Sequence, residues 1–161
     1  MKVLKVILKV KLLIALSGLV VFGLTRALAG ETSSVWTGAG KVYDAKLNPL
    51  GAYKLKVESA KTAATERKTK VTVTLESGGA QVYNCTHTDG AKGWKSVCDN
   101  GNGGGFCLDD LCQTYTEDEN GRAFATTLIF DSEDEMRLMR TELQNGKPVR
   151  FFKEKISRAR Q

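Results

Sequence analysis

Two segments of the chain alternate strictly between apolar and polar residues, and this alternation constrains the fold more than any other feature. Residues 53–58 have the sequence YKLKVE, and residues 70–75 have the sequence KVTVTL. A period of two places every second side chain on the same face of a β-strand. Each segment therefore predicts a strand with one face against a core and the other face in water.

Turn-forming residues divide the remainder of the chain at short intervals. They include the Ser77-Gly78-Gly79 segment and the pairs Asp89-Gly90, Asn120-Gly121 and Asn145-Gly146. Such residues join adjacent antiparallel strands into hairpins. The pattern predicts an all-β antiparallel meander, and closure into an up-and-down barrel of roughly 8–10 strands would leave no unpaired edge.

The N-terminal segment predicts the compartment. Four lysines up to Lys11 precede an uncharged apolar run over residues 12–24, and Ala27-Leu28-Ala29 places small residues before Gly30. This order indicates a secretory signal peptide over residues 1–29, and hence a secreted or periplasmic protein. The run is shorter than the ~20 residues that a membrane-spanning helix needs, so we expect no stable membrane insertion after cleavage. Residues 30–161 are expected to form a single β-barrel domain.

Removal of the signal peptide changes the charge balance. The full chain has 24 Lys and Arg residues against 18 Asp and Glu residues, which gives a net charge of +6. Five of the basic residues and none of the acidic ones lie within residues 1–29, so the remaining chain has a net charge of +1. Strong basicity is the usual mark of a nucleic-acid-binding domain. We therefore expect no nucleic-acid partner.

All the cysteines lie between residues 85 and 112, in a segment that also contains six of the 16 glycines. They are Cys85, Cys98, Cys107 and Cys112. An even number of cysteines in an exported chain predicts two disulfides. Cys107 would face Cys112 across a turn at residues 109–110, and Cys85 would face Cys98 across a loop centred on residues 91–92. These pairings are favoured, while the nested pairs Cys85–Cys112 and Cys98–Cys107 remain open.

Neither a metal nor a cofactor is predicted for this segment. The gaps between successive cysteines are 12, 8 and 4 residues, whereas structural zinc sites prefer two close cysteine pairs. Asp99 begins a segment similar to a calcium-binding loop, but Gly101 and Gly103 stand where that loop needs oxygen ligands. We interpret residues 99–105 as a glycine-rich loop.

The only histidine, His87, lies two residues after Cys85. A thiol beside an imidazole would suggest a nucleophile with its base, but a cysteine in a disulfide cannot act as a nucleophile. We expect His87 to lie at the end of a hairpin, near water. No other acid–base or nucleophile set is evident, so the protein is predicted not to be an enzyme.

One predicted strand carries arginines on both faces. Met136, Leu138 and Arg140 share one face, and Arg137 lies on the other. An inward arginine would hold the carboxylate of a ligand. The alternative is an arginine on the outer wall paired with an acidic residue, which is the more frequent arrangement in proteins.

The segment Trp36-Thr37-Gly38-Ala39-Gly40, followed by hairpins over residues 34–155, resembles the opening strand of the calycin group. This group comprises lipocalins, fatty-acid-binding proteins and related barrels. The resemblance implies a barrel that holds a small apolar molecule. The haem-binding relatives need a late histidine ligand, and no histidine follows His87.

Two functions follow as hypotheses. The first is an exported, non-enzymatic binding protein with a small apolar ligand inside the barrel. The expected ligand-binding residues are Trp36, Tyr53, Trp94, Phe124, Phe130 and Arg140. The alternative is a protein-binding module of the inhibitor or adhesion type that acts through the disulfide-linked loops of residues 86–112. A protein binder can have a filled core with exposed aromatic residues on its loops.

Overall fold

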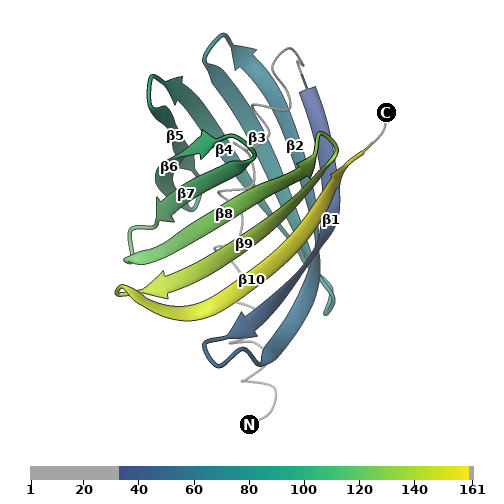
Figure 1. Cartoon of the computed structure of the whole chain (residues 1–161). Helices are drawn as coiled ribbons and strands as arrows, with labels where there is room; N and C mark the ends of the chain where they lie inside the picture. The colour runs from purple at the N-terminus through teal and green to yellow at the C-terminus, as the bar shows by residue number, and fades with distance from the viewer. Residues whose placement is uncertain (1–32, 160–161) are drawn as a thin grey trace.

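The structure is a computed structural model that describes residues 33–159, and these residues form a closed antiparallel barrel of ten strands (Figure 1). The strands are β1 (Ser33–Asp44), β2 (Pro49–Ala63), β3 (Glu66–Leu75), β4 (Ala80–Gly90), β5 (Gly93–Cys98), β6 (Gly101–Leu108), β7 (Leu111–Glu117), β8 (Arg122–Ser132), β9 (Glu135–Gln144) and β10 (Lys147–Arg158). The predicted signal peptide, residues 1–29, lies outside the described residues. No helix within residues 33–159 is long and apolar enough to cross a membrane.

Each strand pairs with its neighbours in sequence, and β1 closes the barrel by pairing with β10. Trp36 therefore lies between Arg158 of β10 and Val57 of β2. Closure gives every strand two hydrogen-bonded neighbours and removes the sheet edges. The predicted fold, an up-and-down β-barrel, is confirmed.

The alternation seen in the sequence separates the interior of the barrel from the outer wall. On β2, Tyr53, Leu55 and Val57 are buried, whereas Lys54 and Lys56 are exposed. The interior combines an apolar cluster with an unusual number of polar side chains, including three arginines and two glutamates. Burial of the cluster stabilises the barrel, while the polar groups need partners inside it.

Both favoured disulfides are present. Cys85 and Cys98 are cross-strand neighbours on β4 and β5, and Cys107 and Cys112 are cross-strand neighbours on β6 and β7. The Cα atoms of the two pairs are 4.1 and 4.0 Å apart. The nested pairing is therefore excluded, because the register of the strands places Cys85 opposite Cys98 and Cys107 opposite Cys112.

The prediction of a glycine-rich loop over residues 99–105 is wrong, because residues 101–108 form strand β6. The glycines allow the flanking strands to approach closely. A Cβ atom on Gly105 would lie 2.7 Å from the Trp94 ring of β5 and would also overlap the Gln113 carbonyl of β7. Glycine is usually unfavourable in a strand, but here it makes close packing between strands possible.

Candidate functional site in the barrel interior

A buried ion pair and a tyrosine occupy the barrel interior. Arg140 Nη2 donates to both carboxylate oxygens of Glu154 at 3.0 Å, and the Tyr53 hydroxyl donates to the same carboxylate. The side chains of Arg140 and Glu154 are each 1% exposed, so each charge depends on the other for compensation. Burial, together with the nearby Glu154 charge, raises the pKa of Tyr53 well above its usual value. The phenol therefore remains a donor at neutral pH.

The strand register brings these side chains together. Glu154 lies opposite Gly40, and Gly40 lies opposite Tyr53, so no side chain separates the carboxylate from the phenol. A Cβ atom on Gly40 would lie 2.7 Å from Cε2 of Tyr53, which shows that the ring occupies the space left by the glycine. Phe152 lies opposite Arg140, with its ring centroid 5.8 Å from the guanidinium carbon. This distance allows a cation–π attraction.

Part of the Arg140 guanidinium has no hydrogen-bond partner among the described residues. Its Nε and Nη1 atoms are buried and unpaired. Thr126 on β8 lies opposite Arg140, and Thr114 on β7 lies opposite Thr126. The hydroxyls of both threonines are also buried without a partner in residues 33–159. Because buried polar groups are nearly always hydrogen-bonded to protein or to ordered water, the donors of this row can serve an acceptor that does not belong to the chain.

Most of the residues predicted to contact a ligand do lie at the interior. Trp36, Tyr53 and Phe124 are buried in the apolar cluster, and Trp94 and Phe130 are partly buried and pack against it. The structure therefore places them on the side of the sheet that a ligand inside the barrel would contact.

The sequence allowed an arginine of this strand to point inward or to lie on the outer wall, and β9 contains one arginine of each kind. Arg140 points inward. Arg137 lies on the outer wall, where its Nε and Nη2 atoms donate to Asp131 Oδ1 at 2.9 and 2.6 Å. Of these two arginines, Arg140 is therefore the one that faces the barrel interior.

The expectation that His87 lies near water is wrong, because its side chain is buried inside the barrel. The hairpin of β4 and β5 extends beyond it to Gly90 and Gly93, so His87 faces Ser96 within the sheet. Its Nδ1 atom lies 2.8 Å from the Ser96 hydroxyl. Burial and the nearby Arg67 charge lower the pKa of His87 to about 3, so the imidazole is neutral at physiological pH.

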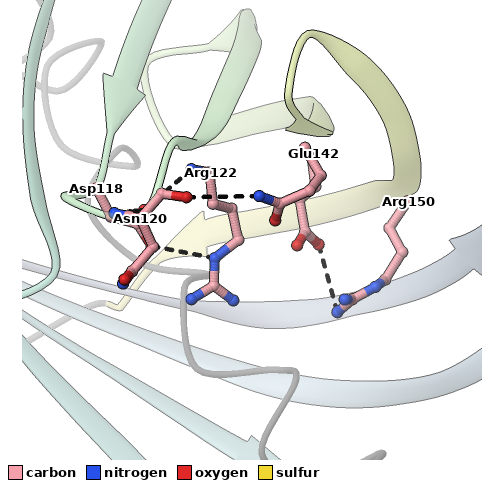
Figure 2. A network of polar contacts seen from close by, with 6 residues as sticks. Asp118, Asn120, Arg122, Glu142 and Arg150 are labelled. Atoms are coloured by element: carbon pink, nitrogen blue, oxygen red, sulfur yellow. Dashed lines mark hydrogen bonds and ion pairs between the residues drawn. The ribbon is translucent and has the colours of Figure 1, made fainter.

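A second polar network lies where β9 and β10 meet the turn between β7 and β8 (Figure 2). Arg150 Nη1 contacts Glu142 Oε2 at 3.3 Å, across the β9–β10 pair. In the turn, Arg122 Nε donates to Asp118 at 3.1 Å. Burial raises the pKa of Glu142, although the Arg150 charge opposes this effect. Each of the two arginines in this network is therefore paired with a carboxylate.

Sequence reasoning missed Glu154 and Arg150 as interior residues. Arg150, Phe152, Glu154 and Ile156 recur at every second position and are all buried. The same period of two that identified β2 and β3 could have placed them on one face. Charged residues at two of these positions concealed the pattern, because charged side chains are normally exposed.

Comparison with known proteins supports the fold. No protein-family model matches the chain, and no curated protein matches it. The barrel is similar to an S-type phycobiliprotein lyase from Guillardia theta, with a TM-score of 0.61 and 9% identity over 80% of this chain and 88% of that one. It is also similar to a protein of unknown function from the DUF3598 family of Nostoc punctiforme, with a TM-score of 0.63 and 14% identity over 78% of this chain. The chain spans 47% of the length of that protein. At these identities the similarity supports the fold, an antiparallel β-barrel, and establishes no activity.

Proposed function

We propose that the protein is an exported, non-enzymatic binding protein that holds a small molecule inside the barrel. The ligand has an apolar body and one acidic group. The observation that carries the proposal is the unpaired part of the Arg140 guanidinium, in one row with the unpaired hydroxyls of Thr126 and Thr114. A carboxylate at this row would accept charge-assisted hydrogen bonds, while its apolar body would contact Trp36 and Phe124.

Export and a binding role rest on separate observations. Disulfides persist mainly in oxidising compartments, and both cysteine pairs form them. The His87–Ser96 pair resembles a base with a nucleophile, but an imidazole with a pKa of about 3 is too weak a base to activate a hydroxyl at neutral pH. These interior groups favour binding over catalysis.

Ligand entry requires interior side chains to move. The unpaired nitrogens of Arg140 are covered by protein atoms, and the Phe152 ring lies over the guanidinium. Displacement of this ring would uncover the anion-binding part of the site. The bound and free proteins are therefore expected to differ in the packing of Phe152.

Native mass spectrometry of the protein purified from its own host tests whether a small molecule is retained. In solution, anilinonaphthalene sulfonate serves as a probe that has both an anionic group and an apolar body. The Thr126→Val variant removes one donor of the row without burying a charge. We expect it to weaken probe binding by about 10-fold, because hydrogen bonds to charged groups contribute about 1.5–3 kcal/mol.

The Thr72→Val variant is the matched control, because Thr72 lies on the outer face of β3. It should bind the probe like the unchanged protein. Equal affinities for the two variants, together with no retained small molecule in the native protein, would rule out this site.

The disulfide-linked hairpin of β6 and β7 supports a second candidate function, a protein-binding module. Leu108 is 67% exposed and lies opposite the exposed Leu111, next to the Cys107–Cys112 disulfide. A rigid apolar surface at a loop tip suits recognition of another protein. The Leu108→Gln variant should no longer capture the host proteins that the unchanged protein captures. The control variant Leu47→Gln, which changes an equally exposed leucine elsewhere, should still capture them. If both variants capture them, this hairpin is not the protein-binding surface.

A further inference from the structure

The hairpin of β1 and β2 combines exposed leucines with lysines. Leu47, in the turn of this hairpin, is 66% exposed, and Leu50, at the start of β2, is 43% exposed. The hairpin projects from one end of the barrel (Figure 1). Tyr43 and Phe151 form a half-buried cross-strand pair just behind the tip. Two exposed leucines close together at one projecting turn give this end of the barrel an apolar tip that another surface could cover.

Lysines dominate the outer wall behind this tip. Lys41 lies opposite Lys153 across β1 and β10, and both are exposed, as is Lys54 on β2. Further along the same wall lie Lys56, Lys68, Lys70 and Lys155. These seven lysines all belong to the four neighbouring strands β10, β1, β2 and β3.

Few acidic residues offset this charge. Glu58 pairs with Lys56 at 2.8 Å, and Glu135 of β9 pairs with Lys155 at 3.1 Å. Glu66 lies at the far end of β3, where it accepts a hydrogen bond from Thr62. Near the tip, Asp44 accepts hydrogen bonds from the backbone and side chain of Asn48. Lys41, Lys54 and Lys153 form no ion pair among residues 33–159, so their charges face solvent.

We propose that this hairpin and lysine wall form a docking surface for an anionic lipid membrane. Leu47 and Leu50 would enter the interface between headgroups and acyl chains, while Lys41, Lys54 and Lys153 would contact lipid phosphates. Apolar insertion and lysine attraction to anionic lipids reinforce each other at membrane surfaces. The proposal concerns the outer wall and does not depend on the interior ligand.

The charges near the exposed leucines differ between the two ends of the barrel. The β6–β7 tip also exposes leucine, but Asp109 and Asp110 form its turn. Anionic lipids would repel that turn. A soluble polyanion such as an acidic polysaccharide would satisfy the lysines but would leave Leu47 and Leu50 in water, so a lipid surface fits both features better.

Flotation with vesicles tests the proposal on residues 30–161. We expect binding to vesicles that contain phosphatidylglycerol and none to vesicles of phosphatidylcholine alone. The Lys41→Gln/Lys153→Gln variant should weaken binding about 25-fold, since each lysine near an anionic surface contributes about 5-fold. The Leu47→Gln variant should also weaken binding.

Two matched variants serve as controls. Lys92→Gln/Lys95→Gln removes the same charge from the other end of the barrel, and Leu108→Gln removes an equally exposed leucine there. Both should bind vesicles like the unchanged protein. The proposal fails if these controls lose as much binding as the hairpin variants, if phosphatidylglycerol adds nothing, or if heparin binds with the same lysine dependence while vesicles do not.

Discussion

Replacement of Arg140 by methionine is expected to lower the free energy of unfolding by about 3–5 kcal/mol, the usual cost of removing one partner from a buried ion pair. The side chains of Arg140 and Glu154 are each 1% exposed, and Glu154 would lose its only compensating cation in hydrogen-bond contact within residues 33–159. Tyr53 would still donate to the carboxylate, but a phenol supplies no positive charge. Urea denaturation at neutral pH measures this change.

Arg137→Met provides the control on the same strand. Arg137 makes its ion pair with Asp131 in solvent, where water compensates each charge, so its loss should have little effect on stability. The double variant Arg140→Met/Glu154→Met should recover much of the lost stability, because it leaves no uncompensated charge. If Arg140→Met were no more harmful than Arg137→Met, the ion pair would not contribute as the structure implies.

Sequence periodicity predicts which face of each strand a residue occupies, but it does not show which interior side chains meet. Alternation and turn residues predicted the barrel, and hairpin register favoured the disulfide pairing that the structure contains over the nested one. The contact between Tyr53 and Glu154 depends on closure of the barrel between β1 and β10, across a glycine that leaves the space open. Such long-range closure has no local sequence signal.

The position of His87 shows a second limit of local patterns. Asp89-Gly90 is a favoured turn pair, yet the strand continues to Gly90 and the turn falls at residues 91–92. This shift moves His87 from the expected hairpin end into the sheet, opposite Ser96. The pairing of Cys85 with Cys98, which needs a loop centred on residues 91–92, predicted the position of the turn correctly.

Acidification is expected to destabilise the barrel through His87. The folded protein keeps its imidazole neutral down to a pKa of about 3, because burial and then the Arg67 charge disfavour the cation. The unfolded chain takes up this proton near pH 6.5. The stability that comes from the neutral imidazole is therefore complete above about pH 6.5 and is lost as the pH falls towards 3. At about pH 4.5 the loss should reach about 3 kcal/mol relative to neutral pH.

The His87→Asn variant separates this effect from the titration of carboxylates. Asparagine cannot take up the proton but can form a hydrogen bond with Ser96, so the variant should lose about 3 kcal/mol less than the unchanged protein between neutral pH and pH 4.5. Denaturant unfolding at both pH values measures the difference. Because the chain has a single histidine, NMR also follows its imidazole directly. Titration of that resonance near pH 6.5 in the folded protein would contradict a buried, neutral His87.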